Sequence, residues 1–217
     1  MNRQEETPWN FCDYRCEVCR YQESCNVFHA VETERRILIA EGKDPDDLDN
    51  VLASVGANLA GVLEQAKEKA RSLGIDPEAA IREAPPLRPR RKDPLFQKSM
   101  DLTLRIFKFL EARRPETAAP DAQATAWENL AWYHTLFSAK IGRAIGGLEH
   151  AADWDPQWGV PDYRVSAGIA LKSIDECRLA LETLRGALPA AVLEIAALLA
   201  GLEELRATVR ERFDRVM

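Results

Sequence analysis

Four cysteines stand close together near the start of the chain. They are Cys12, Cys16, Cys19 and Cys25, and their spacing is C-x3-C-x2-C-x5-C within fourteen residues. Thiolates are soft donors that favour zinc, copper(I) and iron–sulfur centres. In a reducing compartment, grouped cysteines bind metal more often than they form disulfides. The spacing therefore predicts a metal centre held by these residues, with two disulfides or buried thiols as the alternative.

The spacing also bears on the kind of metal. Structural zinc sites usually take two tight pairs of ligands separated by about a dozen or more residues. Here all four cysteines fall in one short segment. Iron–sulfur clusters commonly take three closely spaced cysteines and a fourth one. We therefore predict a 4Fe–4S cluster, with zinc as the alternative.

Few other residues form a set with chemical meaning. The chain has no Glu-x-x-His pair of the kind that di-iron helical bundles need, no phosphate-binding glycine loop and no nucleophile–base set, so we predict no catalytic residue. His134 lies on an apolar helical face and is interpreted as a core histidine, with a pocket role as the alternative. Cys177 is interpreted as a core thiol.

Two known motifs resemble parts of the cysteine segment. Residues 16–25 (CEVCRYQESC) are similar to the C-x2-C-x5-C end of the iron–sulfur staple of RecB-family nucleases, including an aromatic residue between the last two cysteines. The resemblance implies a cluster but no nuclease activity, because the catalytic residues of those enzymes lie on a sheet. Residues 12–19 also match the C-x3-C-x2-C triplet of radical SAM enzymes. That assignment is rejected, because the strands and glycine-rich motifs of the barrel are missing.

A wider resemblance joins the cysteine segment to the helices. Residues 10–19 (NFCDYRCEVC), together with Trp132-Tyr133-His134 and residues 140–144 (KIGRA), look like a group of uncharacterised bacterial proteins with an N-terminal cysteine motif and a helical region. The resemblance brings no activity with it. It implies that the four cysteines act as a set, and that Tyr133 and His134 line a pocket.

Composition and charge limit the class of protein. The 217 residues are 46% hydrophobic and 29% charged, which is typical of a globular protein. A net charge of -6 opposes a general nucleic-acid binder. A basic cluster near the middle of the chain could contact phosphate; it consists of Arg88, Arg90, Arg91 and Lys92. We interpret these residues instead as the charged side chains of a proline-rich linker. With no signal peptide and no span of roughly 20 apolar residues, we expect a soluble cytoplasmic protein without membrane contact.

Helices are the elements predicted to position these residues. A helical pattern covers residues 27–40, and Asp-Pro pairs at 44–45, 76–77 and 93–94 predict helix starts at about 45, 77 and 94. Further helices are expected over 121–148 and 162–187 and from Pro189 onward. No run alternates with a period of two, so no sheet is predicted.

The sequence therefore predicts an all-α protein with a metal-binding knot ahead of a helical bundle of about five main helices. The expected divisions are 1–42 for the cysteine segment and its helix, 43–84 for a helical hairpin, 85–93 for the linker and 94–217 for the bundle. The expected function is that of a non-catalytic metal-cofactor module that presents a surface to a protein partner. The alternatives are an iron–sulfur redox component and a nucleic-acid-binding accessory protein; the oligomeric state is open.

Overall fold

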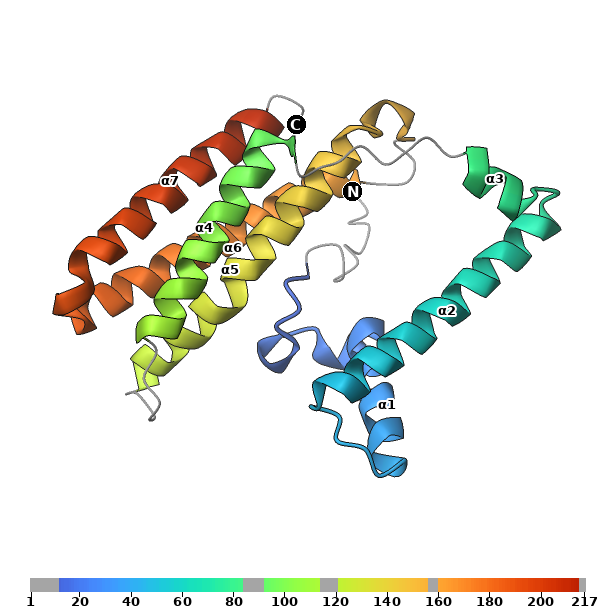
Figure 1. Cartoon of the computed structure of the whole chain (residues 1–217), viewed down its shortest axis with the longest axis horizontal. Helices are drawn as coiled ribbons and strands as arrows, with labels where there is room; N and C mark the ends of the chain where they lie inside the picture. The colour runs from blue at the N-terminus through green and yellow to red at the C-terminus, as the bar shows by residue number, and fades with distance from the viewer. Residues whose placement is uncertain (1–11, 84–91, 114–120, 156–159, 215–217) are drawn as a thin grey trace, which may run out of the picture. The chain divides into compact units, whose positions relative to one another are not determined.

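The computed structural model describes residues 12–83, 92–113, 121–155 and 160–214. These residues form seven α-helices and several short 3-10 turns, with no strand in the described ranges (Figure 1). The predicted all-α class is confirmed. The chain divides into two compact units, residues 15–88 and residues 1–14 with 89–217. Within the described ranges, no helix is long and apolar enough to span a bilayer.

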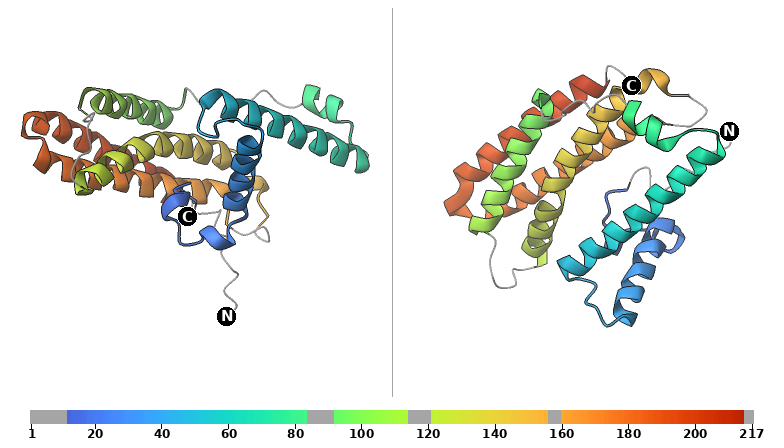
Figure 2. Two further views of the ribbon diagram at one scale, coloured as in Figure 1. Left: turned by 90° about the horizontal axis from the view of Figure 1, so that it is seen from below. Right: turned by 45° about the vertical axis from the view of Figure 1, so that its right-hand side comes forward.

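The larger unit is a four-helix bundle. Its helices are α4 (Pro94–Arg113), α5 (Asp121–Leu148), α6 (Asp162–Ala187) and α7 (Val192–Asp214). They run alternately up and down, and each packs against two others in the order α4, α5, α6, α7 and back to α4 (Figures 1 and 2). The bounds predicted for α5 and α6 agree with the structure. A 3-10 turn over Pro189–Ala191 precedes α7, so Pro189 starts this turn rather than the α-helix.

The core of the bundle follows the apolar spacing of its helices. Leucine, isoleucine and phenylalanine side chains from all four helices are completely or almost completely buried, among them Ile106, Phe109, Leu130, Phe137, Ile141, Ile174, Leu181, Leu184, Ile195, Leu202 and Leu205. Each fully buried side chain of this size contributes about 1.5–3 kcal/mol relative to an exposed one. The bundle therefore has a stabilising core of its own.

Aspartates cap two helices as their Asp-Pro pairs predict. Asp93 accepts hydrogen bonds from two backbone N–H groups in the first turn of α4, at 2.9 and 3.3 Å. Asp76 does the same for α3 (Pro77–Glu83). Because proline at the first helical position has no N–H to leave unsatisfied, both starts are favourable. The predicted starts at Pro77 and Pro94 are confirmed.

The predicted start at about residue 45 is wrong, because α2 begins at Leu48 and ends at Ser72. Asp47 is its N-cap and accepts a hydrogen bond from the N–H of Asn50 at 3.0 Å. Asp44 instead accepts the N–H of Asp46 at 2.9 Å, which closes a turn before the helix. A run of aspartates offers several caps, and the carboxylate engaged in this turn cannot also start the helix.

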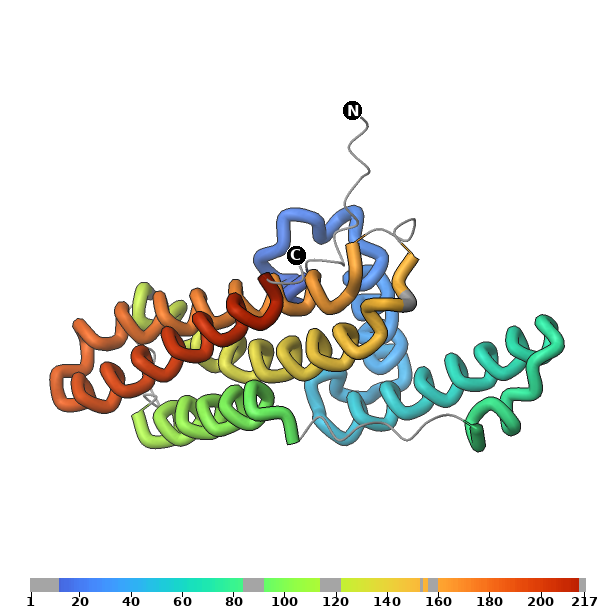
Figure 3. Tube along the Cα trace, turned by 90° about the horizontal axis from the view of Figure 1, so that it is seen from above, coloured from blue at the N-terminus to red at the C-terminus, as the bar shows by residue number. Residues whose placement is uncertain are grey.

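The smaller unit contains α1 (Asn26–Ala40), α2 and α3, preceded by 3-10 turns at Cys16–Val18 and Gln22–Ser24. Helices α1 and α2 line the two sides of one groove, and α3 follows the far end of α2 in the tube view (Figure 3). Gly42 and Gly74 have φ angles of 73° and 76° and end α1 and α2 in the left-handed conformation that glycine adopts without strain. Across its described residues, this unit buries only Cys25, Leu38 and Pro77.

The predicted linker lies mostly outside the described ranges. Residues 85–91, and with them Arg88, Arg90 and Arg91, are not among the residues that the structure describes. Lys92 is described and is exposed. A phosphate contact by these four residues therefore stays a prediction.

Candidate metal centre

Three of the four motif cysteines sit on the two short turns before α1. Cys16 opens the first 3-10 turn, and the N–H of Cys19 donates to the Cys16 carbonyl at 3.2 Å. The second turn ends at Cys25, whose N–H donates to the carbonyl of Gln22 at 3.3 Å. The motif is thus a pair of tight turns with extended backbone at Cys19 and Cys25. This geometry differs from a continuous α-helix, in which Cys12, Cys16 and Cys19 would share one face.

Cys25 occupies the N-terminus of α1. It is the N-cap of the helix, and its Sγ accepts a hydrogen bond from the N–H of Phe28 at 3.5 Å. Its side chain is buried, with 7% exposure. The unpaired N–H groups and the dipole of a helix N-terminus favour negative charge there. The position therefore suits a thiolate.

Cys12 also accepts a backbone hydrogen bond. The N–H of Tyr14 donates to the Cys12 Sγ at 3.3 Å. Tyr14 has a φ of 61°, in the left-handed region that non-glycine residues rarely adopt. Its ring lies 4.8 Å from Nζ of Lys140 in a cation–π contact. The unusual backbone at Tyr14 therefore accompanies two contacts, one to the sulfur and one to the bundle.

Lys140 supplies a buried positive charge to this part of the bundle. Its side chain is 8% exposed. Burial lowers the pKa of Lys140, and Arg143 lowers it further, whereas Cys12 and two aspartates, Asp13 and Asp162, oppose the shift. The Cys12 sulfur and the two carboxylates therefore favour the charged form of Lys140.

Asp13 anchors the start of the motif to the bundle. The Tyr133 hydroxyl donates to Asp13 Oδ2 at 2.8 Å, and Lys172 Nζ lies 2.5 Å from the same oxygen. The Trp132 indole N–H donates to the Asp13 backbone carbonyl at 2.9 Å. Two helices, α5 and α6, thus hold the residue next to Cys12. We refer to these three contacts of Asp13 as the Asp13 anchor.

Sequence reasoning did not single out Asp13. The wider resemblance implies that Tyr133 lines a pocket, whereas the structure gives its hydroxyl a carboxylate partner. The available signal was that Asp13 and Trp132-Tyr133 fall in two segments of the same wider resemblance. Nothing in the spacing could reveal a contact between residues 120 positions apart.

His134 lies in the interior of the bundle. Its Nδ1 is 2.9 Å from the Ala131 carbonyl oxygen and 3.0 Å from that of Leu130, within its own helix. Burial lowers the pKa of His134, and the two carbonyls only partly oppose this effect. The ring is therefore neutral, with its proton on Nδ1 facing the carbonyls. This environment is that of a core histidine, and the pocket role stays a prediction.

The fifth cysteine is separate from the motif. Cys177 on α6 has no exposed surface, and burial raises its pKa. A neutral thiol in such a position behaves as a small hydrophobic side chain. All five cysteines are thiols rather than disulfides.

The described part of the cysteine motif does not form a metal-binding group. In the described parts of the chain, no group of three or more histidine, cysteine or acidic side chains is close enough together to hold a metal ion. Cys12 belongs to the unit that contains the bundle, and Cys16, Cys19 and Cys25 belong to residues 15–88. The donor types suit a soft metal, but the metal centre stays a prediction.

Comparisons with known proteins do not assign a family or function to this chain. The chain matches no family model, no curated protein and no solved structure.

Proposed function

We propose that this protein binds a metal cofactor through Cys12, Cys16, Cys19 and Cys25, and that a 4Fe–4S cluster is preferred to zinc. The centre serves as a structural staple of a non-catalytic interaction module. The observation that carries the proposal is the placement of four thiols within fourteen residues at the head of a unit with almost no core.

The need for a staple follows from burial. Residues 15–88 bury only Cys25, Leu38 and Pro77 among those described. A unit of this size cannot offset the conformational entropy of its chain with so little buried apolar surface. Small units of this kind are commonly stabilised by a structural metal. Metal binding would then contribute folding free energy directly.

The surroundings of two sulfurs support metal ligation. Cys12 and Cys25 each accept a backbone N–H, and Cys25 caps a helix N-terminus. A cluster with four thiolate ligands carries net negative charge, which N–H donors and a helix dipole stabilise. The same features would not be needed for inert thiols.

Ligation requires the cysteine segment to rearrange. The sulfurs have to approach one another, and the backbone that carries three of them consists of 3-10 turns. Such turns have poorer hydrogen-bond geometry than α-helices, so their rearrangement costs little. Coupling between ligand binding and local folding is the usual behaviour of small metal-binding segments.

An electron-transfer role is the second candidate, and one observation favours it. Lys140 places a buried positive charge near Cys12, and backbone N–H groups donate to two of the sulfurs. Positive charge and hydrogen bonds to the sulfurs raise the reduction potential of an iron–sulfur cluster. Visible absorption that bleaches reversibly with dithionite would support this role.

The deciding experiment is metal analysis and absorption spectroscopy of protein purified without oxygen. We expect about four iron atoms per chain and broad thiolate-to-iron absorption for the cluster. About one zinc per chain without colour would assign the alternative metal. Cys16→Ser should lower the metal content strongly, whereas Cys177→Ser, the matched control outside the motif, should leave it unchanged. A preparation that contains neither metal overturns the proposal.

A further inference from the structure

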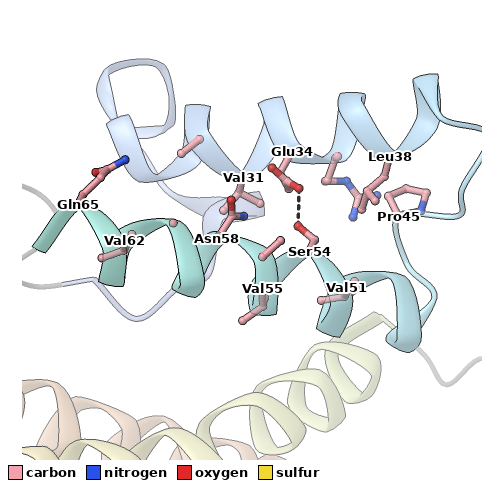
Figure 4. A pocket seen from close by; sticks show the side chains of 14 residues that line it. Val31, Glu34, Leu38, Pro45, Val51, Ser54, Val55, Asn58, Val62 and Gln65 are labelled. Atoms are coloured by element: carbon pink, nitrogen blue, oxygen red, sulfur yellow. Dashed lines mark hydrogen bonds between the residues drawn. The ribbon is translucent and has the colours of Figure 1, made fainter. Parts of the chain in front are cut away.

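Helix α2 carries two adjacent seams of side chains, and α1 covers only one of them. Val51, Ser54 and Asn58 of α2 face α1 across a groove of about 710 Å³, which Val31 and Leu38 of α1 also line (Figure 4). A hydrogen bond from the Ser54 hydroxyl to Glu34 crosses this groove. Small and polar residues dominate the seam that already has a partner.

The second seam is more apolar, and within the described residues of its own unit no other helix covers it. It consists of Leu48, Leu52, Val55, Leu59, Val62 and Ala66, which we call the α2 seam. Its five large side chains are 48% to 67% exposed. Val55 and Val62 lie at its border with the groove. The alternating spacing of four and three residues is that of a helix packed against another helix in a coiled coil.

The charges of α2 indicate what covers this seam. No charged residue occurs from Asn50 to Leu63. The N-terminal end is acidic, with Asp44, Asp46, Asp47 and Asp49, whereas Lys67, Lys69 and Arg71 outnumber Glu64 and Glu68 at the other end. A second α2 in the opposite direction places each acidic end beside a basic end. A parallel second copy would place the aspartates side by side.

We propose that the α2 seam binds the α2 seam of a second copy of this chain in antiparallel orientation. With a and d positions facing each other, Leu52 meets the second copy's Val62, and Val55 meets the second copy's Leu59. Leu48 meets the second copy's Ala66 at each end. Every layer combines one leucine with one smaller residue, so the layers are similar in volume.

The same register brings the charged ends together. Asp47 lies level along the helix pair with the second copy's Lys67, which also pairs with Glu64 and Glu78 of its own chain, when Leu52 lies opposite Val62. The antiparallel arrangement also opposes the two helix dipoles favourably. A surface that complements itself in this way forms a closed two-fold dimer rather than an open chain. Two α1–α2 hairpins then make a four-helix bundle, in which α2 touches two neighbours.

The first test is the mass of the full-length protein in solution by light scattering over a range of concentrations. We expect twice the 24.4 kDa mass of one chain. Leu59→Glu should weaken the dimer at least about a hundredfold, because each dimer would bury the new carboxylate twice. Leu179→Glu on α6 is the matched control, because Leu179 is 65% exposed and Leu59 is 64% exposed.

Helix content measured by circular dichroism verifies that both variants fold. A wild-type protein that stays monomeric at every concentration overturns the proposal, since the seam then has another occupant. A Leu59→Glu variant that dimerises as well as Leu179→Glu also overturns it.

The second test determines the register and direction. Leu52→Glu and Val62→Lys should each be monomeric alone. An equimolar mixture should form a heterodimer, because the antiparallel register places the new carboxylate beside the new ammonium group. A parallel pair would not bring these positions together. If the mixture stays monomeric, the antiparallel register is wrong.

Discussion

The four-helix bundle and the unit of residues 15–88 are both made of amphipathic helices, yet they bury their apolar residues very differently. In the bundle, the apolar stripes of α4 to α7 face one another, and Leu130, Phe137 and Ile174 are inaccessible to solvent. In residues 15–88, a stripe of similar spacing on α2 stays exposed. A helical period shows that a helix has an apolar face, whereas burial requires a partner for it. The bundle contains its partners, whereas for the smaller unit we propose a metal and a second chain as the missing partners.

Removal of the proposed metal should produce the largest difference between the two regions, measured as protection from hydrogen exchange. With a chelator or in Cys16→Ser, we expect residues 16–40 to lose hydrogen-exchange protection by at least about tenfold, because the unit then lacks its staple. Amides in the core of α5 and α6 should keep theirs. Equal protection of residues 16–40 with and without metal would show that the staple does not exist.

Truncation of the bundle core should have the next largest effect. Phe137→Ala is expected to lower the free energy of unfolding by about 3–5 kcal/mol, because it removes a fully buried ring and leaves a cavity. Ile39→Ala on α1 should change it by less than about 1 kcal/mol, since Ile39 is 60% exposed. Urea unfolding followed by circular dichroism measures both. Similar losses for the two variants would contradict the contrast in burial.

The Asp13 anchor should contribute more to the free energy of unfolding than an ordinary surface ion pair does. Asp13→Ala removes a carboxylate that is 15% exposed in its side chain and bonded to Tyr133 and Lys172. We expect a loss of about 1–3 kcal/mol. Asp162→Ala breaks the Arg143 pair, whose side chains are 41% and 58% exposed, and should cost below about 1 kcal/mol. Thermal unfolding of the two variants measures both losses of stability. A smaller loss for Asp13→Ala than for Asp162→Ala would contradict the prediction.

Acid should weaken the bundle slightly through His134. Because burial lowers its pKa in the folded state, the unfolded state binds the proton more readily. Stability is therefore lost as the pH falls below about 6.5, the ordinary pKa of histidine. The slope for one proton is at most about 1.4 kcal/mol per pH unit. Urea unfolding at pH 7.5 and 5.5 should show a smaller difference in His134→Gln than in the wild type.

Local signals explain which parts of the fold could be predicted. Asp76 and Asp93 stand directly before a proline and a helical pattern, so the starts of α3 and α4 follow from nearest-neighbour chemistry. The start of α2 was misplaced because several aspartates compete for the cap, and the choice depends on a turn closed by Asp44. Local preference identifies the aspartates that can cap the helix, and the turn before the helix determines which of them does so.

The site was harder to predict than the helices. The cysteine spacing gives the donor types but not the turns that hold Cys16 and Cys25. The Asp13 anchor joins residues 119 to 159 positions apart, and such contacts leave no periodic trace. The apolar spacing of α2 predicts an apolar face, but spacing alone does not state whether that face is covered.

The indole of Trp132 has a practical consequence. It donates to the carbonyl of Asp13, one residue from Cys12, and it is 40% exposed. In a variant whose other four tryptophans are replaced by phenylalanine, its fluorescence should report on the first cysteine. Any event that pulls the backbone at this cysteine should change the emission of an intrinsic chromophore, without an attached dye.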